Sequence, residues 1–150
     1  MPELIDIVNQ KGVDLINNIR INLGRTGTNA TLKTSQSLRQ EVTENSETIN
    51  FKLYGRAFFM TVQTGRRPTP DKKPSREMIE NLRPWAASRG IDESKVWAIA
   101  TKIQKQGTQL WREGGREDIV EPAVDTFVND LSLSLLDQLA TDFQIKVREW

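Results

Sequence analysis

Histidine and cysteine are absent from this 150-residue chain, and their absence excludes several kinds of chemistry. Nucleophilic catalysis of the Ser-His-Asp and Cys-His types needs an imidazole or a thiol. Structural zinc sites, and most catalytic ones, need His or Cys ligands. Carboxylate, lysine and Mg²⁺ chemistry remain, but the Asp and Glu residues are spread singly along the chain. We therefore expect a protein that is not an enzyme and that uses no metal or cofactor.

Long hydrophobic runs are also missing. The longest apolar run has only a few residues, whereas a helix that spans a bilayer needs about 20. The first residues, Met1-Pro2-Glu3-Leu4, lack the basic segment and apolar stretch of a signal peptide. The absence of cysteine fits a reducing compartment. We expect a soluble protein that is synthesised in the cytoplasm and has no membrane partner.

Neither sign of charge is in excess. The chain has 21 Lys and Arg against 20 Asp and Glu, a net charge of +1, which gives little long-range attraction to phosphate groups. Any basic surface must therefore be local. The mean hydropathy of −0.54 indicates a large surface that is solvated or faces partners.

The first half of the chain predicts a helix followed by a β-hairpin. Apolar residues recur at helical spacing over 3–23, and Gly24 is placed to end this helix. Gly12 falls on its apolar side, where the missing side chain lets a neighbour approach closely. Residues 24–37 are rich in Gly, Thr, Ser and Asn, which favours a flexible connection. The segments 37–43 and 47–54 alternate apolar and polar residues and predict two strands joined by a turn at 44–46.

The run 54–62 allows a third strand or one to two helical turns. Residues 65–76, GRRPTPDKKPSR, contain three prolines, which exclude both helix and central strand and predict an extended basic loop. Ser75 is placed to cap a helix that ends at Gly90. Asp92 is placed to cap a second helix, in which we expect Trp97 to be buried.

A long C-terminal helix is the last predicted element. Asp118 and Glu121 have the spacing of a capping box, and Pro122 falls in the first turn, where no amide hydrogen is required. The apolar stripe of this helix comprises Val120, Val124, Phe127, Leu131, Leu135, Leu139 and Phe143. It must be covered by the sheet or by another subunit. The expected fold is a single α+β domain over 1–150, with helices packed on a small antiparallel sheet.

Several short motifs occur in a fixed order between Tyr54 and Thr108. The segment 65–68 reads Gly-Arg-Arg-Pro, and 85–90 reads Trp-Ala-Ala-Ser-Arg-Gly. The segment 98–103 reads Ala-Ile-Ala-Thr-Lys-Ile, and 107–108 reads Gly-Thr. This series resembles the tail-completion and neck-protein family of long-tailed bacteriophages, over about a third of the chain. The segment 112–118 is more charged than that family's pattern.

The resemblance implies a virion protein at the head–tail junction, between the capsid portal and the tail tube. Proteins of this family assemble as rings, commonly of six, and have no catalytic activity. The implied partners are further copies of the chain, the neighbouring portal or adaptor and tail-tube proteins, and DNA passing through the ring lumen. An alternative is a non-enzymatic nucleic-acid-binding or regulatory adaptor that uses the basic loop. An enzyme that holds Mg²⁺ with carboxylates ranks last.

Seven residues are candidates for an interface with protein or DNA. Cations on an extended segment attract phosphate without reading sequence, although the same segment is also typical of a solvated surface loop. Trp111 lies in a short break between glycines, and Trp150 is the last residue; both suit anchors inserted into a partner. The candidates are Arg66, Arg67, Lys72, Lys73, Arg76, Trp111 and Trp150.

Overall fold

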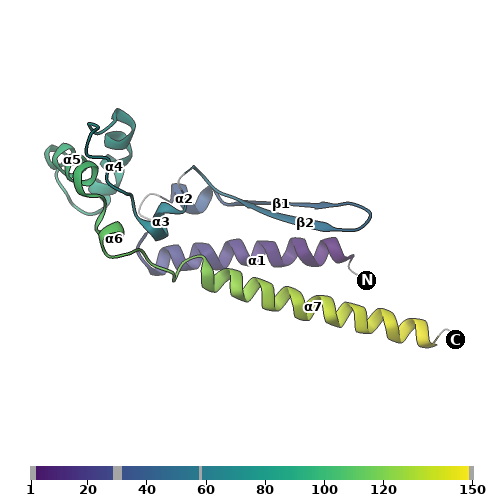
Figure 1. Ribbon diagram of the computed structural model, residues 1–150. Coiled ribbons are helices and arrows are strands. Elements are labelled where there is room, and N and C mark those ends of the chain that lie inside the picture. The colour runs from purple at the N-terminus through teal and green to yellow at the C-terminus, as the bar shows by residue number, and fades with distance from the viewer. Residues whose placement is uncertain (1–2, 29–31, 58, 149–150) are drawn as a thin grey trace.

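The structure, a computed structural model, describes residues 3–28, 32–57 and 59–148. It consists of a long arm and a small helical unit at one end of that arm (Figure 1). The elements are α1 (Leu4–Arg25), α2 (Lys33–Gln36), β1 (Arg39–Glu44), β2 (Ile49–Tyr54), α3 (Thr61–Thr64), α4 (Arg76–Ser88), the 3₁₀ helix η1 (Glu93–Lys95), α5 (Val96–Gln106), α6 (Gln109–Arg112) and α7 (Glu121–Arg148). The predicted α+β class, with a two-stranded antiparallel sheet and a long C-terminal helix, is confirmed.

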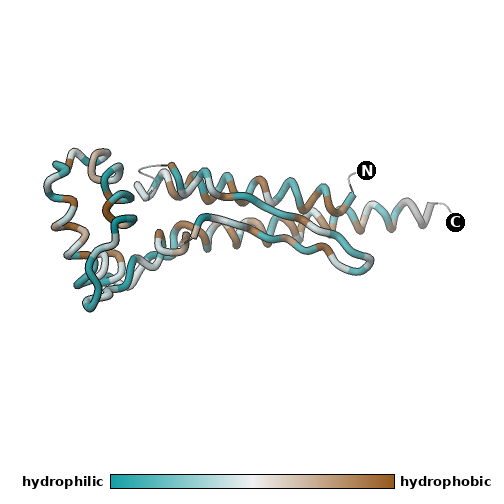
Figure 2. Tube along the Cα trace, turned by 90° about the horizontal axis from the view of Figure 1, so that it is seen from above, coloured by the Kyte–Doolittle hydropathy of each residue, from teal (hydrophilic) through white to brown (hydrophobic). Residues whose placement is uncertain are grey.

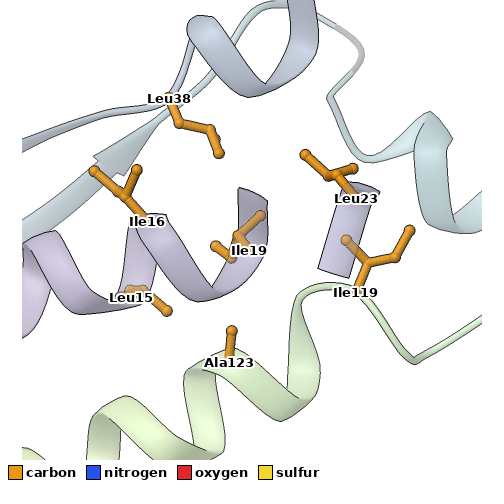
Figure 3. Packing of buried hydrophobic residues seen from close by; sticks show 7 residues of the cluster. All are labelled: Leu15, Ile16, Ile19, Leu23, Leu38, Ile119 and Ala123. Atoms are coloured by element: carbon orange, nitrogen blue, oxygen red, sulfur yellow. The ribbon is translucent and has the colours of Figure 1, made fainter. Parts of the chain in front are cut away.

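The arm is built from α1, the hairpin and α7, which run alongside one another with α1 and α7 antiparallel (Figure 1). Its core is made by Leu15, Ile16, Ile19, Leu23, Leu38, Ile119 and Ala123, which point toward one another from α1, the start of the hairpin and the start of α7 (Figure 3). The rings of Phe51 and Phe127 lie 4.9 Å apart and join the hairpin to α7. Seen from above, hydrophobic stretches recur along both long helices (Figure 2).

The hairpin agrees with the prediction except at its turn and its edge. β1 and β2 pair with Arg39 opposite Tyr54 and Glu44 opposite Ile49. The strands cover 39–44 and 49–54 where 37–43 and 47–54 were predicted, so the turn covers 45–48 instead of 44–46. The Asn45 side chain accepts a hydrogen bond from the Thr48 backbone N–H at 2.8 Å in this turn. Within the described residues no third strand joins the sheet. The helical alternative holds only for one turn at the end of the run, since α3 covers Thr61–Thr64 and the described residues between Tyr54 and Thr61 form neither helix nor strand.

The approach predicted at Gly12 is confirmed. A Cβ atom on Gly12 would collide with the side chains of Gln40 and Phe51. Gln40 donates a hydrogen bond from Nε2 to the backbone oxygen of Asn9 at 2.9 Å, which ties β1 to α1 at the same point. The hairpin can therefore lie directly on α1 only because position 12 lacks a side chain.

The loop prediction for 24–37 is wrong in part. The helix α1 continues through Gly24 to Arg25, and the backbone N–H of Thr26 donates to the Asn22 carbonyl. Residues 33–36 form α2. At this short helix, Ser35 Oγ donates to the Leu32 carbonyl at 3.0 Å. Residues 29–31 lie outside the described part of the chain.

The expected capping box at the start of α7 is wrong. This helix begins at Glu121, and the Asp118 carboxylate is engaged by the Arg116 guanidinium at 2.6 and 2.8 Å. Two side chains from elsewhere hold the helix start instead. Gln63 of α3 accepts from the Val120 N–H at 2.7 Å and donates to Glu121, and Asn22 of α1 donates to the Ile119 carbonyl. Pro122 lies in the first turn, as predicted.

In the helical unit, α4 and α5 pack against each other and against η1. Ser75 caps α4 by accepting from the Met78 N–H, and Asp92 accepts from the Ser94 N–H at the start of η1. The predicted Ser75 cap is confirmed, whereas the Asp92 cap belongs to η1, which leads into α5. The prediction that Trp97 is buried is wrong, since it is 62% exposed. The buried face of α5 consists of Val96, Ala100 and Gln104. Among the described residues, no helix is long and apolar enough to cross a membrane.

Candidate functional site

Two of the motifs that carry the phage resemblance form one joint. The backbone N–H of Arg66 donates to Thr108 Oγ1 at 2.9 Å, and the Thr108 N–H donates to the Arg66 carbonyl at 3.0 Å. The Thr108 hydroxyl also accepts from the Trp111 N–H and caps α6. The segments 65–68 and 107–108, about 40 residues apart in the chain, are thus held together by reciprocal hydrogen bonds.

The glycines of this joint are required by its geometry. Gly65 and Gly107 have positive φ angles of 73° and 76°, a region that side chains disfavour. A Cβ atom on Gly107 would lie 2.8 Å from the Arg66 carbonyl, and one on Gly65 would lie 2.6 Å from Thr108 Oγ1. Each motif therefore leaves room for the other, which gives their co-occurrence a physical reason.

The basic loop leaves this joint and is fastened to α5. The Thr69 N–H donates to the Gln104 carbonyl at 2.8 Å, and the Gln104 side chain donates back to the Thr69 side chain and carbonyl. Gln104 is 4% exposed, so this clamp is shielded from water. The loop is held in place at its middle, while its basic side chains remain at the surface.

The structure places the five predicted cations in different settings. Arg67, Lys72 and Lys73 are exposed, and no ion pair joins them to the described part of the protein. Arg66 is exposed but donates to Gln104 Oε1 at 3.4 Å. Arg76 belongs to the first turn of α4 and pairs with Glu80 at 2.8 Å, so it is not part of the loop. Three free cations therefore remain of the five.

The two aromatic candidates differ in what the structure shows. Trp111 lies in α6 with one edge against Gly107 and is 43% exposed, so it both closes the joint and presents a surface. Trp150 lies outside the described residues. Trp97, which was expected in the core, presents a larger aromatic surface than Trp111.

The exposed apolar side chains along α7 lie partly outside the stripe that the sequence predicted. The stripe from Val120 to Phe143 was predicted to face a single cover, whereas α1 and the hairpin contact only part of the helix. Sequence could have revealed a second face, because the apolar residues of α7 spread over more than one side of a 3.6-residue helix. Val124, Leu139 and Phe143 are exposed members of the predicted stripe, and Val128, Leu133 and Leu136 are exposed residues outside it.

A shallow cleft of about 480 Å³ lies where the helical unit meets the arm. Its lining includes Arg66, Arg89 and Arg116. The Arg89 guanidinium stacks 5.2 Å from the Trp85 ring and donates to the Gly27 carbonyl at 3.4 Å. All three guanidinium groups are partnered, since Arg66 donates to Gln104 and Arg116 pairs with Asp118. The cleft therefore positions the unit on the arm and presents no free cluster of cations.

Two exposed carboxylates have shifted acidity. Hydrogen bonds from the side chain and backbone of Ser94 lower the pKa of Asp92. The Arg116 hydrogen bond lowers the pKa of Asp118, and Asp118 in turn raises the pKa of Arg116. Each shift arises from a local structural contact. Neither carboxylate sits beside a group on which it would act as an acid or a base.

Over the described ranges, no group of three or more Asp and Glu residues could hold a metal ion. The surface therefore exposes cationic side chains, aromatic side chains and an uncovered apolar face of α7. Such groups suit binding to macromolecules. Comparison with family models, curated proteins and solved structures gives no match to this chain.

Proposed function

We propose that this chain is a structural virion protein, a tail-completion or neck subunit of a ring at the head–tail junction of a tailed phage or prophage. The observation that carries the proposal is the Arg66–Thr108 joint. It brings together two motifs of the resemblance that are distant in sequence. The departure at 112–118 is accommodated without disturbing the joint, because Arg116 and Asp118 of that segment pair with each other.

The shape of the molecule supports the same proposal. A ring subunit needs surfaces that are complete only in the assembly, and α7 carries large apolar side chains that the chain itself leaves uncovered. The helical unit stands at one end of a long arm, so that opposite ends of the subunit can contact different neighbours (Figure 1). The proposed neighbours are further copies, the portal or adaptor, and the tail tube.

The position of the gene tests this proposal. We expect genes for the portal, the adaptor and the tail tube to flank the gene that encodes this chain. A gene that lies among metabolic or regulatory genes, with no portal or tail gene in the same cluster, would argue against a virion role.

A second candidate function is a nucleic-acid-binding adaptor. It is favoured by Arg67, Lys72 and Lys73, which are exposed on a loop clamped to α5. Such a site would bind DNA without sequence preference and more weakly as salt is raised. The test is DNA binding by the wild type and by the triple variant Arg67→Glu, Lys72→Glu, Lys73→Glu, with Lys11→Glu as the control on α1. An adaptor binds DNA as an isolated protein and loses that binding only in the triple variant. Equal, negligible binding by all three proteins would remove this candidate.

A further inference from the structure

Four of the exposed apolar side chains of α7, namely Val128, Leu136, Leu139 and Phe143, lie on one continuous face, and Leu133 lies outside it. On a 3.6-residue helix the positions 121, 125, 128, 132, 136, 139 and 143 lie on one side, since successive spacings are three or four. The last three of these are Leu136, Leu139 and Phe143, which are 61%, 60% and 69% exposed. α7 has 28 residues, whereas α1 has 22. Figure 1 shows this end of α7 projecting from the arm.

The same face is acidic at its other end. Glu121 and Asp125 precede Val128 on it, and residues 121–144 contain five Asp and Glu and no Lys or Arg. Packing α7 against α7 of another copy in parallel would oppose acidic side chains, and like charges at an interface disfavour association. Antiparallel packing would place Glu121 and Asp125 against Leu139 and Phe143, and burying a charge without a partner is costly. The face fits a partner that is basic and also presents exposed apolar groups.

The helical unit of this same chain has those properties. The helical unit, taken as residues 65–113, contains eleven Lys and Arg against six Asp and Glu, a net charge of +5. Residues 114–150, which include α7, contain three Lys and Arg against eight Asp and Glu, a net charge of −5. The unit also exposes Trp97 on α5, which carries Lys102 and Lys105 on its solvent side. Tryptophan is a usual anchor of such contacts, and the two lysines are opposite in charge to the acidic end of the α7 face.

These two surfaces cannot meet within one molecule. The helical unit lies at the end of the arm where α7 begins, and the projecting apolar end of α7 lies at the opposite end (Figure 1). We propose that the face of α7 from Glu121 to Phe143 binds the Trp97 surface of the helical unit of a second copy, head to tail. A contact between two different surfaces repeats from copy to copy, and closes as a ring if the rotation between copies allows it. The inference deepens the proposed function, and only the closure to a ring rests on that function.

Two variants test the contact, and each of these half-interface variants removes one of the two contacting surfaces. The first, Leu136→Gln with Leu139→Gln, removes the apolar end of the α7 face. The second, Trp97→Gln with Lys102→Glu and Lys105→Glu, removes the surface of the helical unit. All five side chains are exposed, so both variants should fold, which far-ultraviolet circular dichroism and the unfolding midpoint check. Ile21→Gln is the control, because Ile21 on α1 is as exposed as Leu136, at 62%.

Sedimentation velocity of the full chain gives the readout. The wild type and Ile21→Gln should form species larger than the 17.1 kDa monomer as concentration rises to about 0.5 mM, and should dissociate as salt is added. Each half-interface variant should associate at least about tenfold more weakly. An equimolar mixture of the two should form a heterodimer and nothing larger, because each partner keeps one intact surface.

Three results would overturn the contact. A wild type that is monomeric at every concentration would mean that another protein covers α7. Association that survives in the helical-unit variant would mean that α7 packs on α7. A mixture that remains monomeric would mean that the two surfaces do not bind each other. None of these results would bear on the position of the gene, which tests the proposed function separately.

Discussion

At the scale of single residues, Gly12 shows how one missing side chain sets the position of a whole element. It lies in the middle of α1, and the hairpin rests on it through Gln40 and Phe51. Glycine inside a helix costs about 1 kcal/mol relative to alanine. The close approach that it permits offsets this cost, because it lets Phe51 reach Phe127 of α7.

Gly12→Ala should therefore lower the free energy of unfolding even though alanine favours the helix. Overpacking costs about 1–3 kcal/mol, which exceeds the gain in helix propensity. Gly24→Ala is the matched control, since Gly24 lies in the same helix and a Cβ atom there would meet nothing within 4 Å. Chemical denaturation of the two variants should differ by about 2 kcal/mol. Equal midpoints for both would show that the hairpin does not lie directly on α1.

Asp118 provides a pH-dependent test at the same scale. Its pKa is lowered in the folded protein from the ordinary value of 3.8 by the Arg116 hydrogen bond. A lowered folded-state pKa stabilises the protein above the unfolded-state pKa, and this contribution is lost as pH falls through the folded-state value. Asp118→Asn should therefore be less stable than the wild type at pH 7, by a small amount because the pair is exposed. The difference in denaturation midpoint should shrink below pH 3.8, and a difference that stays constant with pH would contradict the pairing.

At the scale of elements, the joint between the basic loop and α6 decides how the helical unit is organised. It relies on two glycines with positive φ, and at Gly107 a second requirement adds to the first, because the Arg66 carbonyl occupies the space of a side chain. Backbone strain and steric collision can be separated here, since Gly90 has a similar φ of 66° and open space around it.

Gly90→Ala should cost about 1 kcal/mol of stability through strain alone. Gly107→Ala should cost about 1–3 kcal/mol more, because the collision also breaks the Arg66–Thr108 hydrogen bonds. Thermal unfolding of the two variants measures the difference. In native-state hydrogen exchange, the Thr108 amide should lose protection only in Gly107→Ala. Equal losses in both variants would mean that the joint does not depend on the close approach.

The sequence was most informative about elements whose signals are local. The cap at Ser75 and the alternation in the hairpin are properties of a few neighbouring residues, and they are confirmed. The prediction of a capping box at the start of α7 was wrong because Gln63, 57 residues away in the chain, holds this helix start. A pattern of neighbouring residues cannot reveal such a distant partner. The prediction that Trp97 is buried was wrong because burial depends on which helix covers α5, and the hydrophobic character of a residue does not decide that.

The candidate site followed the same division. The sequence identified the basic loop and Trp111 but included Arg76, because the ion pair with Glu80 depends on where α4 begins. It treated α7 as having one apolar face, although the cover supplied by α1 and the hairpin leaves a second face exposed. The extent of cover is a property of the packed molecule, and it determines what remains for a partner.

At the scale of the whole molecule, the helical unit and the C-terminal part of the chain carry opposite net charges. The helical unit is basic, α7 begins beside it with Glu121 and Asp125 and exposes Leu136, Leu139 and Phe143 toward its projecting end, and α1 and the hairpin lie alongside α7. A molecule with unlike ends is suited to repeated head-to-tail contacts. This arrangement agrees with the proposed role as a subunit of a ring in a virion.

The most direct measurement is electron microscopy of particles made after the gene is deleted from the phage or prophage that encodes it, with the gene resupplied from a plasmid as the control. The account predicts filled heads and separate tails in the deletion lysate, and joined particles when the wild-type chain is resupplied. Complete, infectious particles in the deletion lysate would contradict a role at the head–tail junction.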